Sequence, residues 1–233
     1  HLQGDFLWVG TRYSGLFQIT VSTGAVRHIS EEKAAGLTLP SQDVQCVESG
    51  PADSLLICTA QGLVMYQPQA KTQQLWDGRT GLLTHNIVGA YTDADSNVWL
   101  LSAKGLTLKP AGSARFITFT HQDGLVATEL VFKAIHDNKA GTIYLGTIAG
   151  LAIVEPDLLW VNELPPTVAV PEILINHQPL PMLAHSKDWP AIVLKPTDSS
   201  IEFKFASLDY HDVNRNQFLY RLRGFDADWI LQS

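Results

Sequence analysis

The chain has 233 residues, 45% of them apolar and 17% charged, which is enough to bury a large core and excludes a disordered chain. Its formal net charge of −7, without any run of Lys or Arg, disfavours binding to nucleic acid or to an anionic membrane surface. Its apolar stretches are far shorter than the ~20 residues that cross a bilayer and it opens with no signal peptide, so we expect any such segment outside this sequence.

One phrase recurs four times in the first two-thirds of the chain. The copies are LWVGTRYSGLF from Leu7, LICTAQGLVMY from Leu56, VWLLSAKGLTL from Val98 and IYLGTIAGLAI from Ile143. The glycines of successive copies are 47, 43 and 45 residues apart, at Gly15, Gly62, Gly105 and Gly150. A repeat of this length, built from short β-prone runs, is typical of the blades of a β-propeller.

Each blade is expected to contain four antiparallel strands. A Gly-Leu pair at residues 36, 81 and 124 precedes each inner strand, and the third repeat predicts strands at 87–92, 98–102, 105–109 and 115–120. The first copy begins directly with its LWVGT strand, so we expect its inner strand to be missing. The repeats then either close as a tight four-bladed ring or form the C-terminal arc of a larger propeller, which we favour.

Three tryptophans lie inside apolar runs, at Trp8, Trp99 and Trp160. An aromatic side chain in a buried strand packs more often than it stacks on a ligand. We therefore expect these three to act as core wedges between blades.

The two cysteines, Cys46 and Cys58, are 12 residues apart. This spacing places them on neighbouring strands of one blade, where a disulfide is geometrically possible but buried free thiols are more common. We therefore favour free thiols, with a bridge as the alternative. Neither a CxxC pair nor a Cys/His metal spacing is present, and no pattern indicates a cofactor.

Asp93, Asp95 and Asn97 form a D-x-D-x-N sequence like the opening of a calcium loop. The sixth position is Val98 where a glycine is needed, and the twelfth is Lys104 where a bidentate glutamate is needed. We therefore interpret the segment as an Asp/Asn-rich turn and predict no metal site.

Blade geometry predicts which loops share a binding surface. In an antiparallel blade, the loop between strands two and three and the crossover to the next blade emerge on the same face of the disc. Polar groups around this face predict a site for a small polar ligand such as an oligosaccharide, with a solvated rim as the alternative. The candidate ligand-binding residues are Arg12, Tyr13, Gln42, Gln61, His85, Asn86, Lys104 and Glu129.

The same loops leave an enzymatic alternative open. His85 and Glu129 could serve as acid and base in a propeller lyase. Ser14 lacks the preceding G-x of a nucleophile elbow, so we interpret it as a turn serine. We predict no catalytic residue, and a lyase and a non-binding assembly scaffold are the alternatives to a ligand sensor.

From Pro166 the sequence changes character. The Gly-Leu phrase disappears, prolines become frequent, and apolar residues alternate with polar ones, as at Ile201, Phe203 and Phe205. This predicts a half-buried antiparallel sheet in residues 166–233, following the blades of residues 1–165. The predicted fold class is all-β, a partial β-propeller of about four blades followed by a truncated immunoglobulin-like sandwich.

The order of these motifs resembles the propeller repeats of two-component regulators. Those repeats run from Asp-Gly-Leu through an Asn and a Val strand to Asp-x-x-Gly, Trp-Ile-Gly-Thr and Gly-Leu, and DGRTGLLTHNIVGAYTDADSNVWLLSAKGLTL is similar in that order. SIEFKFASLDY through FLYRLRGFDADW is similar to the core of triple-tyrosine domains, with Tyr210, Tyr220 and Trp229 at the marked positions. Such a sandwich needs ~100 residues, so with 68 from Pro166 onward we expect its last strands to be missing.

The resemblance covers nearly the whole chain and implies the extracytoplasmic sensing region of a membrane signalling protein. In this family more blades precede the region, and a membrane helix and a kinase, response-regulator fusion or cyclase follow it. The resemblance therefore implies a periplasmic location, a membrane-anchored parent, homodimerisation through the sandwich and no enzymatic activity in this part of the chain.

Overall fold

A computed structural model describes residues 1–29, 36–127, 129–138, 141–159, 167–180, 191–207 and 218–232. The chain is all-β, as predicted, with short 3-10 turns between antiparallel strands. It divides into two compact units, His1–Val161 and Asn162–Ser233. Trp160, Tyr210 and the expected boundary between residues 165 and 166 lie outside the described residues.

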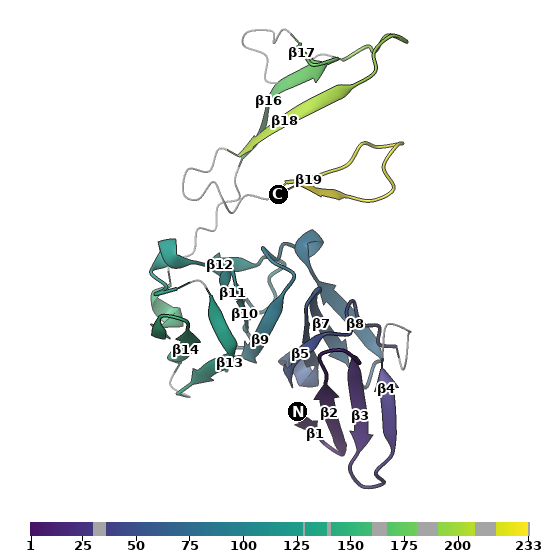
Figure 1. The fold of residues 1–233 in the computed structure, drawn as a ribbon. Coiled ribbons are helices and arrows are strands. Elements are labelled where there is room, and N and C mark those ends of the chain that lie inside the picture. The colour runs from purple at the N-terminus through teal and green to yellow at the C-terminus, as the bar shows by residue number, and fades with distance from the viewer. Residues whose placement is uncertain are drawn as a thin grey trace. The chain divides into compact units, whose positions relative to one another are not determined.

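The sheets of the first unit follow one another in chain order and form a partial propeller (Figure 1). The first blade contains β1 (Leu2–Gln3), β2 (Phe6–Gly10), β3 (Leu16–Thr20) and β4 (Val26–Ile29). The second contains β5 (Val44–Ser49), β6 (Leu55–Thr59), β7 (Gly62–Gln67) and β8 (Thr72–Trp76). The third contains β9 (Ile87–Thr92), β10 (Val98–Ser102), β11 (Gly105–Lys109) and β12 (Ile117–Phe119), and the fourth contains β13 (Leu130–Asp137), β14 (Ile143–Thr147) and β15 (Gly150–Val154).

The first blade corrects the expectation that its inner strand is missing. Leu2 pairs with Leu7 and Gln3 with Phe6, so β1 is a two-residue inner strand. Gly4, at a φ of +57°, makes the reversal that joins β1 to β2. In the fourth blade the described residues form three strands, and residues 160–166, which follow β15, lie outside them.

The repeated phrase closes the hairpin between the second and third strands of a blade. A hydroxyl donates to the carbonyl of the glycine three residues on, from Thr59 to Gly62 at 2.7 Å, from Ser102 to Gly105 at 3.0 Å and from Thr147 to Gly150 at 2.9 Å. Gly105 has a φ of +124°, and an added Cβ would lie 2.1 Å from the carbonyl oxygen of Phe119. At Gly105 the backbone therefore leaves no room for a side chain.

Adjacent blades are joined by apolar cores, and each core takes residues from both blades. The first core contains Trp8, Leu16, Ile29, Leu55, Ile57 and Val64. The second contains Leu56, Cys58, Leu63, Trp76, Val98 and Leu100. The third contains Trp99, Leu101, Leu106, Ile143, Leu145 and Val154. Trp8 and Trp99 are buried in these cores, as predicted.

The Gly-Leu pairs lie within the crossovers between blades, before the next inner strand begins. Gly81 and Gly124 adopt positive φ values of 106° and 95° and each stops a 3-10 turn. The leucine that follows is buried, as at Leu82 and Leu125, so each crossover is pinned to a core by one side chain. The second sequence marker is thus a turn followed by an apolar anchor.

The cysteines form a disulfide, which corrects the preference for free thiols. Cys46 of β5 lies directly opposite Cys58 of β6, with their Cα atoms 4.8 Å apart. Both side chains are buried. The spacing of 12 residues left both outcomes open, because the bridge depends on a register shift between Val44 and Cys46 that the sequence does not show.

Removing this bridge should lower the free energy of unfolding. For a loop of 12 residues the loss expected from chain entropy is about 3 kcal/mol. Chemical denaturation of the Cys46→Ala/Cys58→Ala double variant measures it, and the unmodified chain under dithiothreitol is the control and should lose a similar amount. Rapid alkylation of both cysteines in the unfolded, unreduced protein would contradict the assignment.

The second unit contains two antiparallel sheets, as expected for a sandwich. One is formed by β16 (Val168–Ile175), β17 (Gln178–Pro179) and β18 (Ile201–Ser207), and the other by β19 (Phe218–Tyr220) and β20 (Ile230–Gln232). The ring of Phe205 on β18 stacks on Phe218 and Tyr220 of β19, at centroid distances of 5.9 and 5.8 Å. These rings join the two sheets.

Candidate functional site

The strand directions place the eight predicted site residues at the same end of the blades. Arg12, Tyr13, Gln61 and Lys104 lie in the hairpins between second and third strands, and Gln42, His85, Asn86 and Glu129 immediately precede inner strands. We call this set the loop face. Arg12, Tyr13, Gln61, His85, Asn86, Lys104 and Glu129 are exposed and Gln42 is half-buried, so their polar groups are available to a ligand.

Hydrogen bonds hold several members of the loop face in place. The side-chain amide of Gln45 donates to that of Asn86 at 2.7 Å, which ties the second crossover to β5. The carbonyl of Gln42 accepts from the amide of Gly15 at 2.9 Å, and the carbonyl of Glu129 accepts from the amide of Ile148 at 3.3 Å. The first of these main-chain bonds joins the first blade to the second, and the other lies within the fourth blade, so both kinds fix the rim.

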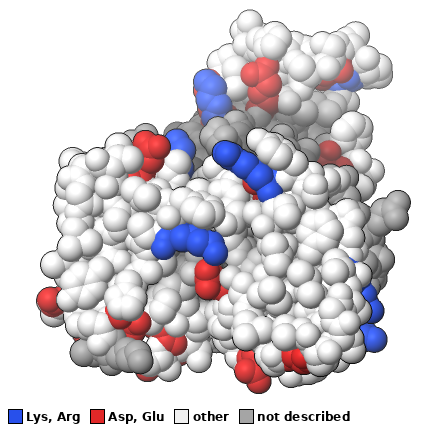
Figure 2. Space-filling model, turned by 60° about the horizontal axis from the view of Figure 1, so that its bottom comes forward, with Lys and Arg blue, Asp and Glu red and all other residues white. Residues whose placement is uncertain are grey.

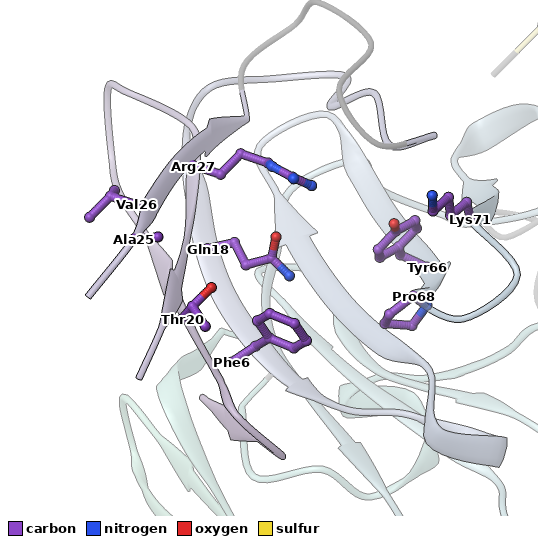
Figure 3. Close-up of a pocket in the computed structure, with 9 residues that line it drawn as sticks. All are labelled: Phe6, Gln18, Thr20, Ala25, Val26, Arg27, Tyr66, Pro68 and Lys71. Atoms are coloured by element: carbon purple, nitrogen blue, oxygen red, sulfur yellow. The ribbon is translucent and has the colours of Figure 1, made fainter. Parts of the chain in front are cut away.

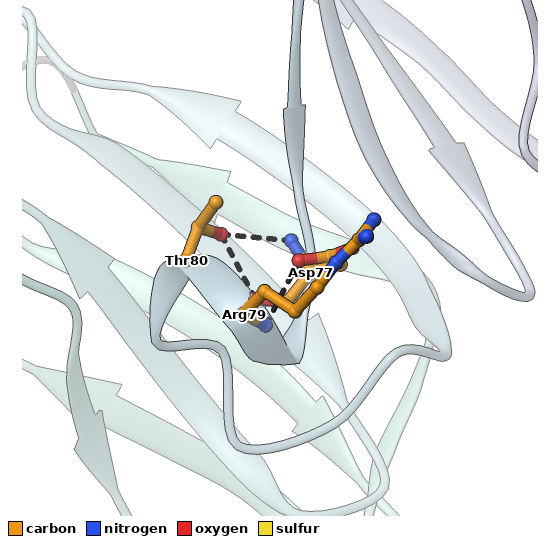
Figure 4. Close-up of polar contacts among 3 residues, drawn as sticks. All are labelled: Asp77, Arg79 and Thr80. Atoms are coloured by element: carbon orange, nitrogen blue, oxygen red, sulfur yellow. Dashed lines mark hydrogen bonds and ion pairs between the residues drawn. The ribbon is translucent and has the colours of Figure 1, made fainter. Parts of the chain in front are cut away.

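A capped turn begins the crossover that carries His85 and Asn86 (Figure 4). The Asp77 carboxylate accepts from the Arg79 amide at 2.9 Å and from the Arg79 guanidinium at 2.8 Å. Thr80 completes the turn, because its hydroxyl accepts from the Asp77 amide at 2.8 Å. Burial alone would raise the pKa of Asp77, but the hydrogen bonds and charge of Arg79 outweigh it and lower that pKa below its ordinary value.

Replacing Asp77 should destabilise the chain in a pH-dependent way. Because the folded pKa is depressed, the carboxylate stabilises the fold above the ordinary Asp pKa and loses its effect as the pH falls through the folded pKa. Asp77→Ala should cost about 1 kcal/mol at pH 7, as for a helix cap.

The measurement is urea denaturation at pH 7 and at low pH, with Asp95→Ala, in an exposed turn, as the matched control. The unmodified chain and Asp77→Ala should converge in stability at low pH. A difference that is the same at both pH values would contradict the role of the carboxylate charge.

The D-x-D-x-N segment is a structural turn, as interpreted from the sequence. The Asp93 carboxylate accepts from the amides of Asp95 and Asn97 at 3.0 and 2.9 Å, and from the indole of Trp99 at 2.8 Å. Protein donors thus occupy the oxygens that a calcium ion would need. Within the described part of the chain, no group of three His, Cys, Asp or Glu residues could hold a metal ion.

A half-buried tyrosine, Tyr91, joins the inner strands of the third and fourth blades. Burial raises the pKa of Tyr91 to about 12, and its hydrogen bond to the Asp137 carboxylate and the nearby charge of Asp93 act in the same direction. Tyr91 therefore stays protonated and keeps donating to Asp137 at any physiological pH.

Charged side chains are few and scattered on the face presented in Figure 2. One oppositely charged pair, Lys133 with Glu48, joins β13 to β5 at 3.4 Å. This face offers no broad basic surface of the kind that binds a polyanion.

A separate cavity of about 350 Å³ lies between the first and second blades (Figure 3). Its lining is formed by Phe6, Gln18, Thr20, Ala25, Val26, Arg27, Tyr66, Pro68 and Lys71. These residues lie where β2 begins, β3 ends and β7 turns into β8, which is the opposite end of the strands from the loop face. The sequence did not single out any of them.

The chain is similar to several known proteins, although no protein-family model matches it. Histidine kinase P4 of Formosa agariphila is 24% identical over 163 residues, which are 66% of this chain and 12% of the kinase. The extracellular domain of the candidate hybrid two-component system BT3049 of B. thetaiotaomicron is 18% identical and matches 100% of this chain with a TM-score of 0.50. The extracellular domain of the candidate one-component system BT4673 of B. thetaiotaomicron is 20% identical and matches 98% of this chain, also with a TM-score of 0.50.

The chain spans 38% and 30% of the lengths of these two solved domains. At these identities the likeness establishes the fold. Both the propeller blades and the second unit of this chain therefore follow the fold of extracellular domains from bacterial signalling systems. Among the residues described, no helix is long and apolar enough to cross a membrane.

Proposed function

We propose that this chain is part of the extracytoplasmic ligand-sensing region of a transmembrane signalling protein of the two-component sensor type. The observation that carries the proposal is the shared fold, which extends across blades and second unit alike to two extracellular domains of signalling systems. The relative among histidine kinases supports the same assignment. The blades would receive a ligand, and the second unit would pass the signal to the membrane without any chemical conversion.

The disulfide supports a periplasmic location. Bridges persist in oxidising compartments such as the bacterial periplasm and are rare in the cytosol. Cys46 and Cys58 form such a bridge in the interior of the second blade.

An exposed apolar face on the fourth blade supports the proposal of a larger propeller. Leu151 and Ile153 of β15 are 61% and 59% exposed. Leu106 and Leu108, which occupy the same positions in β11, are buried against the fourth blade. Another blade would cover β15 in the same way.

The loop face is the proposed ligand site, and its ligand would be a small polar molecule such as an oligosaccharide. The parent protein would be a homodimer joined through the second unit and anchored in the membrane. A lyase using His85 and Glu129 is the rival: both are exposed and precede the neighbouring inner strands β9 and β13. A scaffold that binds no ligand is the third possibility.

Isothermal titration calorimetry with a panel of neutral oligosaccharides tests the loop face. Gln61→Ala/Lys104→Ala, in two exposed hairpins, should weaken binding by about ten-fold or more through lost hydrogen bonds. Gln69→Ala, in the exposed turn at the other end of β7, is the matched control and should bind normally.

The outcome against the proposal is conversion of a bound saccharide, detected by chromatography after incubation. Loss of that conversion in His85→Ala/Glu129→Ala would establish the lyase instead. Absence of binding to every saccharide, together with a strong dimer in sedimentation, would favour the scaffold.

A further inference from the structure

The cavity between the first two blades is lined by a cross-strand pair that is more polar than the equivalent pairs of the next two blades. Three equivalent cross-strand pairs show this, one between the third and fourth strands of each of the first three blades. The pairs are Gln18 with Arg27 in the first blade, Met65 with Gln74 in the second and Leu108 with Ile117 in the third. The pair is fully apolar in the third blade, mixed in the second and fully polar in the first.

The interface between the second and third blades also contains a cation, Lys109, at the cavity end of the strands. Lys109 holds the register position in the third blade that Tyr66 holds in the second. Its ammonium lies 5.6 and 5.8 Å from the ring centroids of Trp76 and Phe116, and it donates to the carbonyl of Ser113. Protein groups therefore satisfy this lysine.

Among the described residues, the two cations at the interface of the first and second blades have no such partners. Arg27 and Lys71 are exposed, and among the described residues neither has a carboxylate within ion-pair distance. Arg27 comes from the first blade and Lys71 from the second, so they line the cavity from its two walls (Figure 3). In a chain of net charge −7, two cations facing one cavity create a local site for an anion.

The remaining lining adds polar and apolar groups suited to a hydroxylated molecule. Gln18 and Thr20 offer an amide and a hydroxyl, and Phe6 offers a ring, all directed toward the cavity in Figure 3. Burial raises the pKa of Tyr66, although the charge of Arg27 opposes this, so its hydroxyl stays protonated. The volume, about 350 Å³, is within the range of ligand pockets, roughly 300–1,000 Å³.

We propose that this interblade cavity binds a hydroxylated carboxylate of monosaccharide size, with the carboxylate at Arg27 and Lys71 and the hydroxyls at Gln18 and Thr20. A guanidinium is suited to this task because its planar donors match a carboxylate. The inference goes beyond the proposed function, because the cavity lies at the opposite end of the strands from the loop face. It also holds if the chain is not a sensor.

Calorimetric titration of the whole chain with glucuronate, and with glucose at the same ionic strength, tests the site. Glucuronate should bind and glucose should bind at least about ten-fold more weakly, since it lacks the charged acceptor. Arg27→Gln and Lys71→Gln should each weaken glucuronate binding by about ten-fold. Both side chains are exposed, and unchanged melting temperatures would show that the variants fold.

Arg223→Gln is the matched control, because it removes the same charge from an exposed arginine of the second unit that belongs neither to the cavity nor to the loop face. It should leave glucuronate affinity unchanged. An equal loss in Arg223→Gln and Arg27→Gln would overturn the cavity as the site, and equal affinity for glucose would overturn the role of the carboxylate. Inorganic sulfate binding as tightly as glucuronate would show a general anion site and overturn the ligand class.

Discussion

The packing of each blade against the next is the interaction on which the rest of this molecule depends. β6 shows it most directly, because all five of its residues are buried. Leu55 and Ile57 enter the core shared with the first blade, while Leu56 and Cys58 enter the core shared with the third. One strand thus stabilises two interfaces, and each fully buried Leu or Ile contributes roughly 1.5–3 kcal/mol relative to an exposed one.

This arrangement explains where the molecule can carry function. Side chains in the middle of the strands pack in the cores, so polar side chains that could bind a ligand are confined to the two ends of each blade. At one end, hairpins and crossovers carry the eight residues of the loop face. At the other end, the same cross-strand position changes from Leu108 and Ile117 to Gln18 and Arg27 and leaves a polar cavity.

The sequence predicts the repeated features well because each has a local cause. The expected strands 87–92, 98–102 and 105–109 coincide with β9, β10 and β11, since glycine and Asp/Asn turns fix their ends. The Cys46–Cys58 bridge was not predicted, because it depends on a register shift within one sheet. The strand β1 was not predicted, because a two-residue strand is too short to show an alternation of apolar and polar residues. The cavity was not predicted either, because it becomes visible only when cross-strand pairs of different blades are compared. These cross-strand pairs can be identified only after the register of the strands is known.

Native-state amide hydrogen exchange on the whole chain tests the central claim, that shared cores between blades hold the first unit together. The account predicts that amides of β6 and β10 exchange most slowly and with the same opening free energy, because both strands belong to cores on each side. The outer strands β4 and β8 should exchange faster. Distinct opening free energies for β6 and β10, with each blade exchanging independently, would contradict it.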